Sequence, residues 1–245
     1  IEIFDIQFDS RKIQRKGLFV AIKGDNTDGH KYIKDTIKDG AVAVIVEKMP
    51  VKLNDNISYI QVEDSYNALG VIASNFYNNP SERIKLVGVT GTNGKTTIVS
   101  LLHQLFSLLN KKVGMLSTIE NKIHDKGLPS THTTPDPLQI NYLLNEMIKK
   151  GCEYCFMEVS SHALVQGRVN SLHFSGGLFT NLTQDHLDYH NTFFEYCDVK
   201  KSFFDALQKD AFALANKDDK NGSKMFEGTK AKKLFYALKS LADYR

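Results

Sequence analysis

The sequence has few cysteines, no long apolar run and no large surplus of one charge, and each absence excludes a class of protein. Its three cysteines, Cys152, Cys155 and Cys197, are odd in number and irregularly spaced. Nothing near residue 1 reads as a signal peptide, so a reducing cytoplasm is the expected location. No apolar run approaches the roughly 20 residues that span a bilayer. The net charge of +3 is spread along the chain, which argues against a membrane or a nucleic acid as partner.

What is present reads as two α/β units that divide near residue 80. A chain of 245 residues exceeds the usual size of one domain. In the first unit, residues 1–80, the pattern predicts strands at 17–24, 41–48 and 57–62 and helices at 28–40 and 64–77. The boundary is placed in "NNPSER" (78–83), because Asn, Pro and Ser favour turns and Pro80 cannot continue a helix.

The second unit, residues 81–245, alternates strands and helices more regularly. Strands are predicted at 84–90, 112–118, 152–160, 176–182 and 211–216, and helices at 95–110, 136–151 and 192–208. Apolar strands that alternate with amphipathic helices predict a mainly parallel sheet covered on both faces. In such sheets ligands bind at the carboxyl ends of the strands.

The stretch "GVTGTNGKTT" (88–97) has the context of a phosphate-binding loop, since a strand precedes it and a helix follows. Gly91 and Gly94 would allow backbone conformations that turn successive N–H groups toward an anion. Lys95 would reach the β- and γ-phosphates, and the Thr96 hydroxyl would bind Mg²⁺. The match to the general pattern is imperfect, because its first glycine would fall at Val89. The alternative is a glycine-rich turn that binds nothing. That alternative leaves the pair Lys95 and Thr96 unexplained, because packing does not require these residues there.

The spacing "GTNGKTT" resembles the variant phosphate loop of the Mur ligases and their folylpolyglutamate synthetase relatives. The segment "DSRKIQRKGLFVAIKGDNTDGHKYI" (9–33) resembles the N-terminal uridine-nucleotide-binding domain of Mur ligases. "THTTPDP" (131–137), "MEVSSHALVQGRV" (157–169) and "FTNLTQDHLDYH" (179–190) resemble their central ATPase domain. The resemblance implies that ATP is held by Gly91, Thr92, Asn93, Gly94, Lys95, Thr96 and Thr97.

Glu158 ends a predicted buried strand, where an unpaired carboxylate would be costly to desolvate. We therefore favour a metal ligand there over a solvated charge. The resemblance implies that Glu158 and His186 bind a second Mg²⁺, in addition to the ion at Thr96. From the residues alone, "DHLDYH" (185–190) is equally well a capping and turn cluster, and His190 is interpreted as structural.

Lys200 matches the lysine that Mur ligases carry as a carbamate. A partly desolvated amine has a lowered pKa, adds CO₂ when neutral and becomes an anion able to bind Mg²⁺. Here Asp198 and Val199 replace the small residues that usually precede this lysine. The neighbouring Lys201 leaves the register uncertain by one, and two exposed helix lysines are the alternative.

The resemblance also implies a set of contacts to the sugar-nucleotide substrate: Ser10, Asp25, Asn26, Thr27, Thr133, Thr134, Ser160, Gln166 and Arg168. A guanidinium such as that of Arg168 can hold a phosphate or carboxylate with two bonds, although the residue alone is equally well a surface arginine. "GDNTDG" (24–29) alone reads as a polar turn. "CEYC" (152–155) enters a strand, which argues against redox chemistry.

Together the resemblance implies an ATP-dependent ligase of peptidoglycan synthesis, a monomer, that adds a third amino acid to UDP-N-acetylmuramoyl-L-alanyl-D-glutamate through an acyl phosphate. That amino acid is meso-diaminopimelate or L-lysine, with diaminopimelate favoured. The likeness stops at "YALKSLADYR" (236–245), so we expect a fragment without the C-terminal domain and without ligase activity of its own. Two alternatives remain. A folylpolyglutamate synthetase lacks the leading uridine-binding domain, and a non-catalytic nucleotide-sugar-binding module would have lost Lys95, Glu158 or His186.

Overall fold

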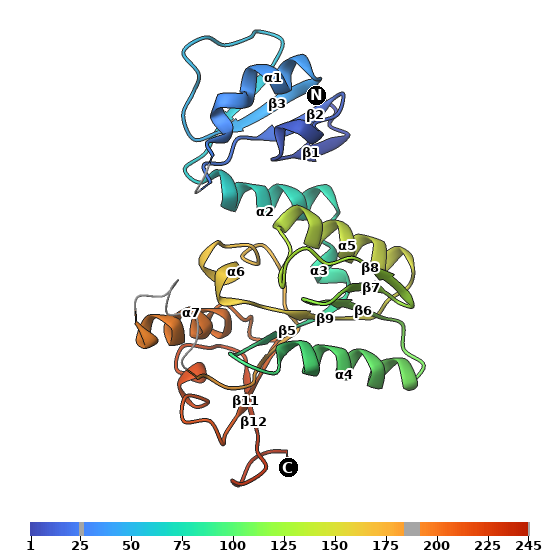
Figure 1. Ribbon diagram of the computed structural model, residues 1–245, viewed down its shortest axis with the longest axis vertical. Coiled ribbons are helices and arrows are strands. Elements are labelled where there is room, and N and C mark those ends of the chain that lie inside the picture. The colour runs from blue at the N-terminus through green and yellow to red at the C-terminus, as the bar shows by residue number, and fades with distance from the viewer. Residues whose placement is uncertain (25–26, 184–191, 245) are drawn as a thin grey trace. The chain divides into compact units, whose positions relative to one another are not determined.

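The computed structural model describes residues 1–24, 27–183 and 192–244 and divides into two compact units, Ile1–Phe76 and Tyr77–Arg245 (Figure 1). The division falls one residue before the stretch 78–83 in which the sequence places it. Part of that stretch is helical, because α3 spans Pro80–Arg83 with the proline in the first turn. Proline is tolerated there, since the first N–H groups of a helix have no partner within the helix.

The first unit contains a parallel sheet of four strands among the described residues, in the order β1 (Asp5–Gln7), β2 (Gly17–Val20), β3 (Ala41–Val46) and β4 (Ser58–Gln61). Two short 3-10 helices, η1 (Ser10–Lys12) and η2 (Gly29–Tyr32), precede the helices α1 (Ile33–Lys38) and α2 (Ser65–Phe76). Phe19, Val44 and Ile33 lie in its core. The sequence does not predict β1, whose short run contains two polar residues.

The second unit contains an eight-stranded sheet within the described residues, in the order β12-β11-β10-β5-β9-β6-β7-β8. The strands are β5 (Lys85–Thr90), β6 (Val113–Leu116), β7 (Asn121–Ile123), β8 (Lys126–Leu128), β9 (Tyr154–Glu158), β10 (Gly176–Phe179), β11 (Phe212–Asn216) and β12 (Lys232–Tyr236). From β12 to β6 all neighbours are parallel, and β7 and β8 add an antiparallel edge. The predicted α/β class with a mainly parallel sheet is confirmed.

The chain order reverses beside β5, and this reversal positions the site. After β5 the chain builds β6 and β9 on one side, and then β10, β11 and β12 on the other. The carboxyl end of β5 is therefore the switch point at which parallel sheets of this kind bind ligands.

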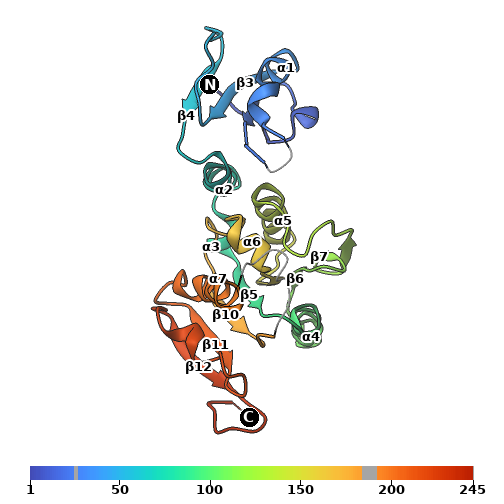
Figure 2. The same cartoon turned by 60° about the vertical axis from the view of Figure 1, so that its left-hand side comes forward.

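Helices cover the two faces of this sheet, as Figures 1 and 2 show for α4 (Lys95–Leu108) on one side and α5 (Pro137–Lys149) on the other. Val99 of α4 packs with Val87 and Val89 of β5. The opposite face carries α5, the short α6 (Ser161–Val165) and α7 (Phe193–Asp205). The larger core lies there and includes Leu144 of α5 and Phe203 of α7. The 3-10 helix η3 spans Lys224–Phe226. In the described parts of the chain, no helix combines the length and apolar character needed to cross a membrane.

Candidate nucleotide and metal site

The glycines of the phosphate loop have distinct structural roles. Gly91 has φ +143° and Gly94 has φ +86°, both in the region that favours glycine. A Cβ on Gly91 would also collide with the Thr180 hydroxyl. Gly88, in contrast, leaves room for the ring of Phe203, whose Cζ would lie 2.6 Å from an added Cβ. The glycine spacing is thus explained by one packing contact and two backbone conformations.

Lys95 lies over the loop that it follows in sequence. Its Nζ donates to the carbonyl oxygens of Gly91 and Thr92, both at 2.9 Å. The helix α4 begins at Lys95, so its first N–H groups and the positive end of its dipole face the same turn. Thr96 is half-buried and Thr97 exposed in this first turn. An ammonium, N–H groups and a hydroxyl at one helix start can hold a phosphate chain.

Glu158 ends β9 beside this helix start and is 1% exposed. Its Oε1 accepts hydrogen bonds from the Thr96 hydroxyl at 2.9 Å and from the Thr118 N–H at 2.7 Å. The burial rules out the alternative of a solvated surface charge.

The Thr96 hydroxyl oxygen and Glu158 Oε1 are close enough to share one Mg²⁺ ion. Octahedral Mg²⁺ binds oxygens at about 2.0–2.1 Å, which places neighbouring ligands about 2.9 Å apart. The Thr96 and Glu158 oxygens have this separation. Among the described residues, no group of three His, Cys, Asp or Glu side chains is placed to hold a metal, and His186 lies outside the described residues.

Lys200 is buried beside Gly91 of the loop. It is 1% exposed, its Nζ donates to the Gly91 carbonyl at 3.1 Å and lies 4.5 Å from the centre of the Tyr196 ring. Lys201 instead pairs with Asp205 at 2.7 Å. The alternative of two exposed lysines is therefore wrong, and Lys200 is the lysine that faces the loop.

The residues expected to contact substrate in the second unit form one cluster beside Glu158. The Thr134 hydroxyl, on a fully buried residue, donates to the Glu158 carbonyl at 2.8 Å and accepts from the Ser160 N–H at 3.1 Å. The Ser160 hydroxyl caps α6. Thr133 accepts a hydrogen bond from the Thr118 hydroxyl at 3.1 Å. The first two hydroxyls thus shape the backbone of the site.

Arg168 is oriented by the same cluster. Its Nη1 donates to the Thr134 carbonyl at 2.6 Å, and Nε and Nη2 donate to Gln166 Oε1 at 2.9 and 2.6 Å. Both acceptors are neutral, so these bonds orient the guanidinium without neutralising it. An oriented guanidinium is suited to a carboxylate or phosphate.

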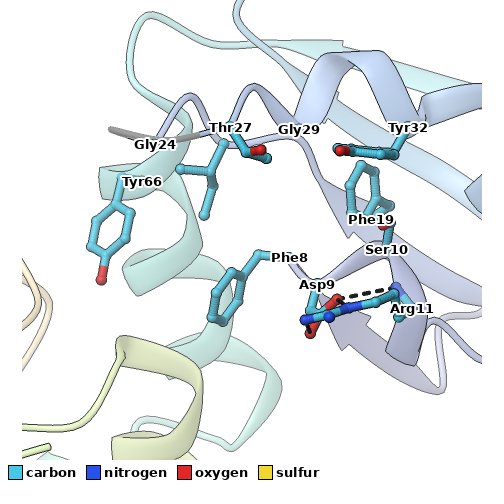
Figure 3. A pocket seen from close by; sticks show the side chains of 11 residues that line it. Phe8, Asp9, Ser10, Arg11, Phe19, Gly24, Thr27, Gly29, Tyr32 and Tyr66 are labelled. Atoms are coloured by element: carbon cyan, nitrogen blue, oxygen red, sulfur yellow. Dashed lines mark hydrogen bonds and ion pairs between the residues drawn. The ribbon is translucent and has the colours of Figure 1, made fainter.

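The first unit holds a cavity of about 650 Å³ that includes the predicted Ser10 and Thr27 (Figure 3). Its lining also contains the aromatic side chains Phe8, Phe19, Tyr32 and Tyr66. Arg11 lies at the same cavity, and its Nε and Nη2 each donate to the Asp9 carboxylate at 2.9 Å. This contact lowers the pKa of Asp9. The predicted Asp25 and Asn26 lie outside the described residues.

The C-x-x-C cysteines are buried and unpaired. Burial raises the pKa of both Cys152 and Cys155, which disfavours the reactive thiolate. This agrees with the argument against redox chemistry.

Two family comparisons account for most of the chain. The Mur ligase middle domain matches residues 89–245, and the domain described as Mur ligase family, catalytic domain, matches residues 2–77. The chain belongs to the Mur ligase family. Within it, the UDP-N-acetylmuramoyl-L-alanyl-D-glutamate--2,6-diaminopimelate ligase of Cytophaga hutchinsonii is 54% identical over 246 residues, covering 100% of this chain and 51% of that protein. The chain spans about half the length of the curated relatives that it matches.

Solved structures agree with this membership. A structure of UDP-N-acetylmuramoyl-L-alanyl-D-glutamate--2,6-diaminopimelate ligase superposes with a TM-score of 0.81 at 28% identity, over 98% of this chain and 50% of that one. A folylpolyglutamate synthase of Mycobacterium tuberculosis reaches a TM-score of 0.53 at 11% identity, over 69% of this chain and 46% of that one. The second likeness concerns the fold alone.

Several residues at the site are not singled out by the sequence. Thr118, Asn181 and Tyr196 contact the predicted residues, yet each comes from a distant segment. Arg11 lies next to Ser10 in "DSRK" (9–12), so its position beside a predicted contact is the one local signal.

Proposed function

We propose that this chain forms the substrate- and ATP-binding part of a ligase that joins meso-diaminopimelate to UDP-N-acetylmuramoyl-L-alanyl-D-glutamate. The observation that carries the proposal is the hydrogen bond between Thr96 and Glu158 at 2.9 Å. It lies beside the loop whose carbonyl groups accept hydrogen bonds from Lys95. This arrangement would supply a phosphate cradle and two adjacent metal ligands. The 54% identity to a ligase with this name supports the substrate assignment.

The proposed reaction has two steps. A carboxylate oxygen of the substrate bonds to the γ-phosphorus of ATP as the bond to the ADP oxygen breaks, which yields an acyl phosphate and ADP. The amine of the incoming amino acid then attacks the acyl carbon, phosphate leaves, and the nitrogen loses a proton to give the amide. Lys95 and the start of α4 would stabilise charge on the phosphates.

Bound Mg²⁺ would offset the charge between the phosphates and the attacking carboxylate. Thr96 and Glu158 would hold one ion, and Glu158, His186 and a carbamylated Lys200 would hold a second. The position of Lys200 supports this role, because the residue is buried and its Nζ lies at the loop.

The cavity of the first unit is proposed to bind the uridine diphosphate. Its aromatic side chains suit a pyrimidine ring, and Ser10, Thr27 and Arg11 offer polar contacts to the ribose and diphosphate. In the second unit, Arg168 is proposed to contact the acidic part of the same substrate. A cytoplasmic location is part of the proposal, with unpaired cysteines as its support. A monomeric state is also part of the proposal.

Calorimetry of this chain tests the proposal. We expect binding of MgATP and of UDP-N-acetylmuramoyl-L-alanyl-D-glutamate, but no binding of dihydrofolate. Lys95→Ala should weaken MgATP binding about 10- to 100-fold, through the loss of a charge-assisted contact. The control Lys111→Ala, beyond the end of the same helix, should leave it unchanged. Binding of dihydrofolate without the uridine nucleotide would favour the folylpolyglutamate synthetase alternative.

A further inference from the structure

The phosphate loop is hydrogen bonded to the segment 180–183 that follows β10. The Thr92 N–H donates to the Asn181 carbonyl at 2.8 Å, and the Thr180 hydroxyl donates to the Asn93 carbonyl at 2.7 Å. The segment therefore lies alongside the loop. In the sheet, β10 lies on one side of β5, and β9, which ends at Glu158, lies on the other.

The side chain of Asn181 completes this pairing. Its Oδ1 accepts from the Asn93 N–H at 3.0 Å, and its Nδ2 donates to the Asn93 carbonyl at 3.1 Å. One side-chain amide thus pairs with both the N–H and the carbonyl group of Asn93. In an antiparallel strand pair, the main chain of the residue opposite makes the same two bonds. The pairing requires a donor and an acceptor on one short side chain, and asparagine has both.

A second layer ties the same loop to α7. The Thr92 hydroxyl accepts from the Thr183 N–H at 3.0 Å and lies 3.3 Å from the hydroxyl of the buried Tyr196. The Tyr196 ring in turn lies against Lys200. The loop is therefore held from two directions. Among the described residues, Asn181 is the one whose side chain contacts both the N–H and the carbonyl group of Asn93.

We propose that Asn181 is a positioning residue, which fixes the shape of the phosphate loop before nucleotide binds. The proposal rests on the proposed function in one respect, that this loop binds the nucleotide. A loop that is already ordered loses less conformational freedom on binding. A neutral amide achieves this without a negative charge beside the triphosphate, so aspartate is a poor substitute.

Two measurements on the whole chain test the proposal, with Asn181→Ala, Asn181→Asp and the exposed control Asn170→Ala. Without nucleotide, Asn181→Ala should speed hydrogen exchange of the Asn93 amide about tenfold, the effect of one lost hydrogen bond. In calorimetry with MgADP, Asn181→Ala should raise the Kd about tenfold with full stoichiometry. Asn181→Asp should raise it further, by a margin that shrinks as salt increases. The control should alter neither quantity.

The outcomes separate a positioning role from a structural one. A residue needed only for folding would lower the stoichiometry and leave the Kd of the folded fraction unchanged, and this result would overturn the proposal. Unchanged exchange at Asn93 in Asn181→Ala would also overturn it. If the unmodified chain does not bind MgADP, the proposed function fails, and the exchange result then decides the role of Asn181 in ordering the loop.

Discussion

Replacing Gly91 with alanine should destabilise the second unit more than the same replacement at Gly94, the other loop glycine with positive φ. At φ +143°, alanine would cost about 1–3 kcal/mol in backbone strain. The added Cβ would also collide with the Thr180 hydroxyl and lie 3.0 Å from the Asn181 carbonyl oxygen. Moving that hydroxyl would break its bond to the Asn93 carbonyl, a further loss of about 0.5–1.5 kcal/mol. The expected decrease in the free energy of unfolding is thus about 1.5–4.5 kcal/mol.

Gly94→Ala is the matched control. Gly94 also has positive φ, but no atom lies within 4 Å of an added Cβ, so only backbone strain of about 1–2 kcal/mol is expected. Urea denaturation followed by circular dichroism, with both variants beside the unmodified chain, measures the difference. Equal stability of the two variants would refute the reasoning that a close approach, in addition to the backbone angle, requires glycine at 91.

Three further predictions concern separate parts of the site and core. Glu158→Gln keeps an oxygen that can accept a hydrogen bond from Thr96, so the free energy of unfolding should change by about 1 kcal/mol or less. Calorimetry with and without EDTA should show that this variant has lost the Mg²⁺-dependent part of nucleotide binding, and retention of that part would exclude Glu158 as a ligand. Arg168→Lys should raise the Kd for UDP-N-acetylmuramoyl-L-alanyl-D-glutamate about tenfold and leave that for MgADP unchanged, and an equal loss for both would contradict the assigned contact. Burial lowers the pKa of His103, which is 7% exposed, so the unfolded chain binds more protons and the stability present above pH 6.5 is lost as the pH falls. The urea midpoint of the unmodified chain should therefore decrease between pH 7.5 and 5.5 by more than the urea midpoint of His103→Asn decreases.

Local patterns in the sequence predict those parts of the fold that depend on local chemistry. The strand β5, the loop and α4 follow from an apolar run, glycines and a helical period, and the structure has all three. The hairpin β7–β8 is missed, because each strand has three residues and no alternation can be read over so few. The helix α3 is missed because Pro80 reads as a break, although it stands at a helix start.

The site itself is only partly predictable, because its contacts join distant segments. Glu158 is recognisable as a carboxylate at a strand end, but its partner Thr118 is 40 residues away in the chain. The contact between Asn93 and Asn181 spans 88 residues. The family resemblance predicts Thr134, Ser160 and Arg168 despite their separation in the sequence, and the structure brings these three residues together. No local signal in the sequence marks Asn181.

The central claim is that Thr96 and Glu158 hold a metal ion beside nucleotide phosphates at this edge of the sheet. A crystal structure of the chain with MgADP tests it most directly. We predict Mg²⁺ at about 2.0–2.1 Å from the Thr96 hydroxyl oxygen and bonded to the Glu158 carboxylate, with Lys95 Nζ moved from the loop carbonyls onto the phosphates. Nucleotide bound elsewhere, or bound here with the hydrogen bond from Thr96 to Glu158 intact and no metal between them, would contradict the account.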